Sequence, residues 1–318
     1  MEKTKQQPLA LRVCAELAGS LLLCFAIYAF STWGSAVYGV NVVFAPLATG
    51  LSYAVISALF ARVSGAQLNP AVTVAAVLTA KTKLADGILY VIAQVIGAIA
   101  AAFAVVKLLP TSEQVAAKVW LSPAVNGFEQ GSVSYSLLTQ YGITFSVTLA
   151  IVVEVIGSLV VVAAAMSSMS ADGTNSDRYA LTMGGAYGIA VAISYPVTGA
   201  GLNPARSTGI ALAAMNEGLT QNPVQQLWVF WIAPVLAAAI VALVMIVVQM
   251  ATTPKSKADD AVADEADGPV TVDAQEDAAD QTVQDSVQEG VRERAEEAEV
   301  RDQQADSQSD ADEGIERH

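Results

Sequence analysis

Histidine is almost absent from this 318-residue chain, and its single copy, His318, is the last residue. Histidine catalysis, histidine metal ligands and histidine pH sensing are therefore excluded from the rest of the sequence. Cysteine is also scarce. Cys14 and Cys24 lie ten positions apart in one apolar segment, and a helix would separate them by about 15 Å, too far for a disulfide. With neither a metal-ligand cluster nor a phosphate-binding loop, we expect no enzyme, no metal site, no cofactor and no nucleic-acid partner.

Charge is scarce in most of the chain as well. Charged residues make up 14% of the sequence and hydrophobic residues 54%, with a mean hydropathy of +0.48. This composition is typical of a membrane protein. Residues 258–318 contain 21 of the 30 acidic residues but only four of the 16 basic ones. We therefore expect an N-terminal segment over 1–8, a membrane domain over 9–250, and an acidic, disordered tail over 251–318.

Apolar runs of two lengths fill the membrane domain. Six are long enough to span a bilayer and cover residues 9–31, 41–62, 84–109, 143–167, 179–197 and 226–250. Two shorter runs, 69–80 and 203–215, each begin at Asn-Pro. As helices they would measure about 16–18 Å, roughly half of a ~30 Å hydrocarbon core. The pattern predicts an all-α membrane protein with six transmembrane helices and two re-entrant half-helices.

The two halves of the domain, about 9–109 and 143–250, repeat each other. AELAGSLL at 15–22 resembles VEVIGSLV at 153–160, and SGAQLNPAVT at 64–73 matches TGAGLNPARS at 198–207 in six of ten positions. Each half contains three full spans, an odd number, so the second half must run upside down relative to the first. An inverted repeat of this kind places the functional site near the membrane midplane, between the halves.

Basic residues predict the orientation of the domain. Most fall on one side of the predicted membrane, and this set comprises Lys3, Lys5, Arg12, Arg62, Lys81, Lys83, Arg178, Lys255 and Lys257. Only Lys107 and Lys118 fall on the other side. The positive-inside rule then predicts that both termini are cytoplasmic. Because no organelle-targeting signal is evident, we expect the plasma membrane, or inner membrane, of the cell.

Each short run begins with the tripeptide Asn-Pro-Ala, formed by Asn69, Pro70 and Ala71 and by Asn203, Pro204 and Ala205. Asparagine is a strong N-cap and proline suits the first helical position, so each asparagine should cap a half-helix. In an inverted repeat the two N-termini meet head to head, with the small alanines allowing the turns to pack. Their partial positive charges would repel cations, and the asparagine amide groups should remain available as donors to a passing oxygen.

These motifs resemble those of the major intrinsic protein family, the aquaporins and aquaglyceroporins, over roughly residues 9–250. The resemblance rests on the repeated Glu-x-x-Gly-Ser, on SGAQLNPAVT and on TGAGLNPARSTG. It implies six spans and two half-helices around one pore per subunit, and a homotetramer in the lipid bilayer. It also implies that Arg206, just after the second asparagine, lines an outer constriction, donates to solutes and repels protons and cations. The alternative is an arginine that reaches the outer headgroups.

The resemblance assigns three more positions to this constriction, or selectivity filter: Thr49, Val191 and Ala200. Water-selective members usually have Phe and His at the first two positions. Because both bulky residues are absent, we expect a wider pore than that of a strict water channel. The aromatic corner of glycerol facilitators is absent as well, whereas Ser207 and Phe230-Trp231 resemble the aquaporin branch.

Two acidic residues, Glu16 and Glu154, fall inside predicted spans at matched positions. Acids in membrane segments often belong to proton relays. Alternatively, each accepts hydrogen bonds from a re-entrant loop and holds it in place, which their symmetric placement and the resemblance both favour.

The function we predict is a passive channel for water that also admits small uncharged solutes such as glycerol, urea, hydrogen peroxide or ammonia, and excludes protons and ions. One alternative is a dedicated facilitator of small neutral solutes with little role in water flow. Another is an ion-coupled secondary transporter, since inverted repeats and broken helices also occur there. A purely adhesive or scaffolding role would leave the Asn-Pro-Ala turns and Arg206 unexplained.

Overall fold

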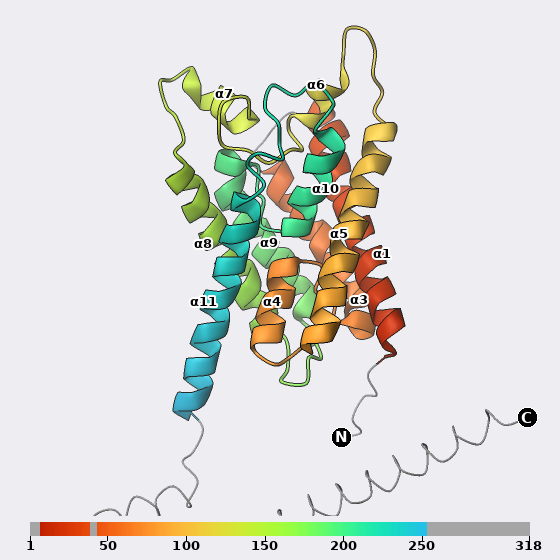
Figure 1. The fold of residues 1–318 in the computed structure, drawn as a ribbon, viewed down its shortest axis with the longest axis vertical. Coiled ribbons are helices and arrows are strands. Elements are labelled where there is room, and N and C mark those ends of the chain that lie inside the picture. Colours follow the sequence, from red (N-terminus) through yellow and green to blue (C-terminus); the bar gives the residue numbers. More distant parts are fainter. Residues whose placement is uncertain (1–6, 39–42, 253–318) are drawn as a thin grey trace, which may run out of the picture. The chain divides into compact units, whose positions relative to one another are not determined.

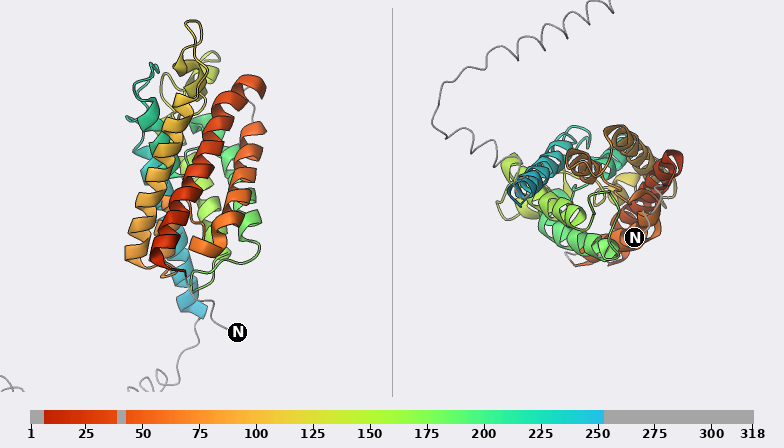
Figure 2. Two further views of the ribbon diagram at one scale, coloured as in Figure 1. Left: turned by 90° about the vertical axis from the view of Figure 1, so that its right-hand side faces the viewer. Right: turned by 90° about the horizontal axis from the view of Figure 1, so that it is seen from below.

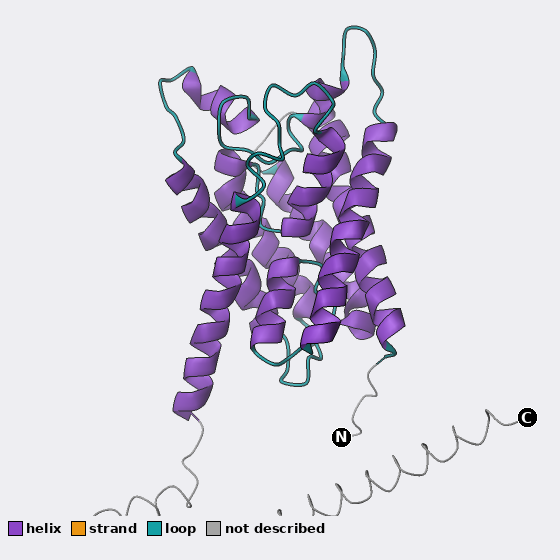
Figure 3. Ribbon diagram, in the orientation of Figure 1, coloured by secondary structure: helices purple, strands orange, loops and turns teal. Residues whose placement is uncertain are grey.

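The computed structural model describes residues 7–38 and 43–252. Every regular element within these ranges is a helix (Figure 3). Six helices are long and apolar enough to cross a membrane, which confirms the predicted fold class. The spans are α1 (Leu9–Ala29), α3 (Phe44–Ser64), α5 (Leu84–Lys107), α8 (Val147–Ser167), α9 (Tyr179–Thr198) and α11 (Val229–Thr252). The predicted tail lies outside the described residues apart from its first two positions, as do residues 1–6 of the predicted N-terminal segment.

The two predicted half-helices are present as α4 (Pro70–Leu78) and α10 (Pro204–Ala214). In Figure 1, α4 lies in the lower half of the bundle and α10 in the upper half. Each half-helix packs against the last span of the opposite half, because α4 contacts α11 and α10 contacts α5. Viewed along the bundle, the spans surround the region that contains the half-helices (Figure 2). The two halves are therefore interlocked and do not form separate bodies.

The outward faces of the spans are apolar. On α3, for example, Leu47, Leu51, Val55 and Leu59 recur every fourth residue and are all more than half exposed. A stripe at this spacing follows one side of a helix. Apolar side chains that face away from the bundle are suited to lipid, and a soluble protein would not expose them in such numbers.

The repeated glycines of the two halves allow close packing. A Cβ atom on Gly19 would lie 2.6 Å from Cδ2 of Leu68, and one on Gly157 would lie 2.6 Å from Cδ2 of Leu202. Each leucine directly precedes the asparagine of its Asn-Pro-Ala turn. The glycine in the repeated Glu-x-x-Gly-Ser therefore makes room for the re-entrant loop of its own half.

The first span extends beyond its predicted end at residue 31. A π-helical turn, Phe30–Gly34, follows α1 and leads into α2 (Ser35–Tyr38). The Ser31 Oγ donates to the carbonyl of Ile27 at 2.8 Å, and the Thr32 Oγ1 donates to the carbonyl of Tyr28 at 2.8 Å. Hydroxyls bonded to the preceding turn often accompany distorted helix geometry, and single π-turns are frequent near functional sites.

The long connection between the halves contains two short helices that the sequence did not predict. They are α6 (Ala117–Leu121) and α7 (Val133–Thr139). Both lie at the same end of the bundle as α10 (Figure 1). Between them, residues 122–132 approach the second re-entrant loop, since the backbone N–H of Gly127 donates to the carbonyl of Thr198 at 3.1 Å.

Candidate pore and its central turns

Both asparagines of the Asn-Pro-Ala turns cap their half-helices, as the sequence predicts. The Asn69 Oδ1 accepts from the N–H of Ala71 at 2.8 Å, and the Asn203 Oδ1 accepts from the N–H of Ala205 at 3.0 Å. The prolines occupy the first helical position of α4 and α10. Each cap is therefore complete within its own half.

The Nδ2 amide group of each asparagine joins the two halves. The Asn69 Nδ2 donates to the carbonyl of Leu202 at 2.9 Å, and the Asn203 Nδ2 donates to the carbonyl of Leu68 at 2.8 Å. Both asparagines are buried. These reciprocal bonds bring the N-termini of the two half-helices together, as expected for an inverted repeat.

The prediction that the asparagine amides remain free for a passing oxygen is wrong for this structure. The Asn69 Nδ2 also donates to the hydroxyl of Tyr187 at 2.6 Å, and the Asn203 Nδ2 also donates to the hydroxyl of Tyr53 at 2.8 Å. An amide NH2 has two hydrogens, so both are used at each asparagine. The two tyrosine rings stack with centroids 3.2 Å apart and an angle of 8° between planes.

The re-entrant loops before the asparagines have an unusual backbone that is the same in both halves. Ala66 and Leu68 have φ angles of 44° and 51°, and Ala200 and Leu202 have φ angles of 57° and 46°. Residues with a Cβ rarely adopt this left-handed region, which costs of the order of 1–3 kcal/mol each. Such loops persist only where surrounding contacts hold them.

Glu16 of α1 provides these contacts in the first half. Its carboxylate accepts from the N–H groups of Gln67 and Leu68 at 3.0 and 2.8 Å, and from Ser64 Oγ at 2.6 Å. The Nε2 of Gln94 adds a fourth bond at 2.7 Å. Gln94, on α5, is a supporting residue that the sequence reasoning missed.

Glu154 of α8 has the equivalent place in the second half. It accepts from the N–H groups of Gly201 and Leu202 at 2.8 and 2.7 Å, and from Thr198 Oγ1 at 2.5 Å. Both acids are fully buried, and neither lines the cavity described next. Their positions favour the loop-holding role over a proton relay.

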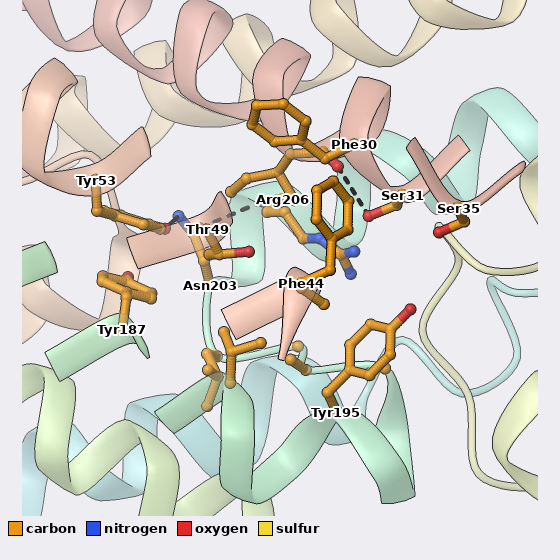
Figure 4. Close-up of a pocket in the computed structure, with 17 residues that line it drawn as sticks. Phe30, Ser31, Ser35, Phe44, Thr49, Tyr53, Tyr187, Tyr195, Asn203 and Arg206 are labelled. Carbon is orange, nitrogen blue, oxygen red and sulfur yellow. Dashed lines mark hydrogen bonds between the residues drawn. The ribbon is translucent and has the colours of Figure 1, made fainter. Parts of the chain in front are cut away.

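The four residues that the sequence assigned to a filter line a single cavity. Thr49 comes from α3, Val191 from α9, Ala200 from the second re-entrant loop and Arg206 from α10. The space open to the centres of water molecules measures about 30 Å³, enough for about two waters. Figure 4 shows Thr49 and Arg206 in this cavity, with Tyr53, Tyr187 and Asn203 beside them.

Besides Tyr53 and Tyr187, three further aromatic side chains that the sequence reasoning missed line the same cavity. They are Phe30 of the π-turn, Phe44 at the start of α3 and Tyr195 of α9 (Figure 4). The rings of Phe30 and Phe44 meet edge to face with centroids 6.0 Å apart. The absence of Phe and His at the assigned filter positions therefore does not leave the cavity without aromatic walls.

Arg206 is buried and held from two sides. Its guanidinium donates to the Asn126 Oδ1 and, at 2.9 Å, to the carbonyl of Ala124. Its own carbonyl accepts from the hydroxyl of Tyr28 at 2.5 Å. Asn126 also accepts from Ser207 Oγ at 2.9 Å and donates to the carbonyl of Gly199 at 2.9 Å. Asn126, which the sequence reasoning missed, therefore fixes the arginine to the loop.

These features define a class: a multi-pass membrane protein with two half-helices whose N-termini meet at the centre of an inverted repeat. The family model described as Major intrinsic protein matches residues 3–245. The chain belongs to this family.

Individual relatives agree with the family assignment. The chain is 32% identical over 201 residues to Aquaporin-4 of Mus musculus, covering 63% of this chain and 54% of that protein. It is 31% identical over 205 residues to Aquaporin FA-CHIP of Pelophylax lessonae, covering 64% and 66%. The chain thus spans between about half and two thirds of the length of these relatives. An X-ray structure of the aquaglyceroporin from Plasmodium falciparum shares the fold, with a TM-score of 0.50, 19% identity, and coverage of 74% of this chain and 95% of that one.

Proposed function

We propose that this protein is a passive transmembrane channel for water that also admits small uncharged solutes, such as glycerol, urea, hydrogen peroxide or ammonia, and excludes protons and ions. The observation that carries this proposal is a cavity lined by Arg206, by three small side chains and by Asn203, one of the two asparagines whose bonds join the N-termini of the half-helices. The proposal includes no catalysis and no cofactor.

Exclusion of ions follows from fixed positive charge along the path. Each half-helix N-terminus has a partial charge of about +0.5, and the guanidinium of Arg206 adds a full charge at the cavity wall. Pores that combine half-helix dipoles with an arginine present an electrostatic barrier to cations and protons. A neutral solute with hydrogen-bonding oxygen or nitrogen atoms avoids this barrier.

Admission of solutes larger than water rests on side-chain size. Thr49, Val191 and Ala200 are small, and they face Arg206 in the same cavity. A hydroxyl on Thr49 and a donor on Arg206 can each bond to a polyol or a urea. The aromatic walls at Phe30, Phe44 and Tyr195 suit the apolar face of such a solute.

The rival mechanisms have weaker support. An ion-coupled transporter needs a buried acid that can exchange its proton or ion with the pathway. Glu16 and Glu154 each accept at least three hydrogen bonds from the loops and their neighbours.

We further propose a homotetramer in the plasma membrane, or inner membrane, with both termini cytoplasmic, the channel domain at 9–250 and an acidic tail at 251–318.

Stopped-flow light scattering on proteoliposomes tests the proposal. Under an impermeant osmotic gradient we expect faster shrinkage than in empty liposomes, and under a glycerol or urea gradient we expect re-swelling. Shrinkage without solute-driven re-swelling would leave a strict water channel and overturn the wide filter. No flux above empty liposomes would overturn the channel itself.

A double variant, Thr49→Phe with Val191→His, tests the filter assignment. It adds two bulky side chains to the cavity wall, so glycerol flux should fall roughly tenfold or more while water flux falls less. The matched control is Leu51→Phe, which adds the same ring to the outward face of α3, where Leu51 is 58% exposed. Equal glycerol flux in the double variant and the wild type would contradict the assignment.

A further inference from the structure

We propose that Tyr53 and Tyr187 form a second constriction at the centre of the pore, and that this tyrosine pair, in series with the four-residue filter, decides which solutes pass and how fast. The inference rests on the proposed channel function. It assigns a specificity-determining role to two residues that lie one helical turn below the filter, since Tyr53 follows Thr49 by four positions and Tyr187 precedes Val191 by four.

The hydrogen bonds of the pair close the path at this level. The Tyr53 hydroxyl lies 2.8 Å from the Asn203 Nδ2, and the Tyr187 hydroxyl lies 2.6 Å from the Asn69 Nδ2. A water molecule placed between a phenol and an amide would need a hydrogen-bond length of about 2.8 Å on each side. The observed distances leave no room for such a water molecule. The phenol oxygens occupy the positions beside the amides that the oxygen of a permeating solute would use.

The extent of the cavity agrees with this closure. It runs from Phe44, through the filter, to Tyr53, Tyr187 and Asn203, and Asn69 is not among its lining residues. The labelled side chains in Figure 4 show the two tyrosines and Asn203 grouped at one side of the cavity. The cavity that passes through the filter therefore ends at the tyrosine pair.

The arrangement is crossed between the halves. Tyr53 belongs to the first half and bonds to the asparagine of the second, whereas Tyr187 belongs to the second half and bonds to the asparagine of the first. The stacked rings support each other, with an angle of 8° between their planes. Movement of one ring removes the stacking partner of the other, so the two residues act as one barrier.

Passage through this barrier requires a specific chemistry. A phenol must leave its asparagine, and an atom of the solute must replace it as the acceptor of the amide hydrogen. Water, alcohol oxygens, urea carbonyls and ammonia can all accept such a bond. Cations cannot accept it and meet two donor groups instead. The pair therefore favours small uncharged acceptors over cations whatever the width of the filter above it.

Two double variants test the proposal by osmotic flux in proteoliposomes, normalised to the amount of reconstituted protein. Tyr53→Leu with Tyr187→Leu removes both rings and both hydroxyls, and we expect water permeability to rise roughly tenfold, with faster glycerol entry. Tyr53→Phe with Tyr187→Phe keeps the rings and the packing but frees one N–H of each asparagine amide. We expect a smaller rise in water permeability and a lower activation energy of water flux.

The matched control is Tyr141→Leu. Tyr141 lies on the connection before α8, is 74% exposed and is not among the residues that line the cavity. Its replacement makes the same change of side chain away from the pair, so water flux should stay within about twofold of the wild type. An equal rise in this variant and in the leucine pair would overturn the proposal.

Other outcomes separate this inference from the proposed function. If the wild type conducts water and neither double variant differs from it, the channel function stands and the tyrosine constriction is wrong. If neither the wild type nor any variant conducts a solute, the proposed function is wrong as well. Should the leucine pair fail to fold, the phenylalanine pair decides, and unchanged flux with unchanged activation energy would overturn the inference.

Discussion

In the first half of the molecule, Val72 follows the Asn-Pro-Ala turn, and in the second half the equivalent residue is Arg206. Both residues are buried in the first turn of a half-helix. The valine packs in the main apolar core, whereas the arginine lines the cavity and is bonded to Asn126 and Ala124. The same backbone conformation thus places an apolar side chain in the core at the start of α4 and a charged side chain in the cavity wall at the start of α10.

The parts that hold the backbone differ much less between the halves. A buried glutamate binds two consecutive N–H groups of each re-entrant loop, and each glycine of the repeat accommodates a leucine of that loop. At its glutamate, the first half has one further bond, from Gln94 to Glu16. The support of the loops is therefore the same in both halves, while the residues that follow the Asn-Pro-Ala turns differ.

Removal of the glutamates should have the largest effect on stability. Glu16→Ala leaves four donors without an acceptor. Glu154→Ala leaves two, because the Thr198 hydroxyl can still donate to the carbonyl of Ser194. At the low end of about 1–3 kcal/mol per stranded donor, the expected losses are at least about 4 and about 2 kcal/mol. Unfolding of the purified variants in mixed detergent micelles measures both.

The control for each alanine variant is the glutamine variant at the same position. Glutamine keeps one acceptor oxygen, so it should lower the free energy of unfolding by less than alanine does. A larger loss for Glu154→Ala than for Glu16→Ala would show that the donor count does not govern the comparison.

Arg206→Val makes the second half resemble the first, and we expect it to weaken ion exclusion. Loss of the fixed charge lowers the barrier to protons, and each 1.4 kcal/mol of lost barrier raises the flux about tenfold. We expect proton permeability, measured with a pH-sensitive dye inside proteoliposomes, to rise by roughly that factor or more. Arg206→Lys retains the charge and should stay near the wild type; a leak as large as that of the valine variant would argue against an electrostatic role.

The smallest effect on stability is expected at Gly19 and Gly157, and it should be nearly equal in the two halves. Gly19→Ala and Gly157→Ala each place a Cβ 2.6 Å from a leucine Cδ2. Overpacking of this kind costs about 1–3 kcal/mol, and the two variants should differ by less than about 1 kcal/mol. Leu68→Val should restore stability to Gly19→Ala but not to Gly157→Ala, and rescue of both would mean that the contact in each half is not the cause.

Sequence reasoning found the features that depend on short segments. The spans follow from the length of each apolar run, and the half-helices follow from Asn-Pro at the start of a run too short to cross the membrane. Their caps form within two or three residues of Asn69 and Asn203. The inverted repeat then brings the two turns together without further information.

The residues that were missed act across long separations in the chain. Tyr187 bonds to Asn69 over 118 positions, Tyr53 to Asn203 over 150 and Arg206 to Asn126 over 80. In the sequence, a tyrosine within an apolar helix is the same as any buried aromatic residue, and Asn126-Gly127 indicates only a turn. The prediction of free asparagine donors, made from the turns alone, was wrong because it could not include the competing acceptors, the hydroxyls of Tyr53 on α3 and Tyr187 on α9.

The reciprocal bonds between the re-entrant turns have a consequence for synthesis of the chain. The carbonyl of Leu68 and its donor Asn203 are separated by 135 positions, and Asn69 and its acceptor Leu202 by 133. At roughly 5–20 residues per second, a ribosome needs about 7–27 s to pass from one partner to the other. For that time the first turn has its own cap but no opposite turn. The pair of joined turns is thus completed only after most of residues 9–250 has been translated.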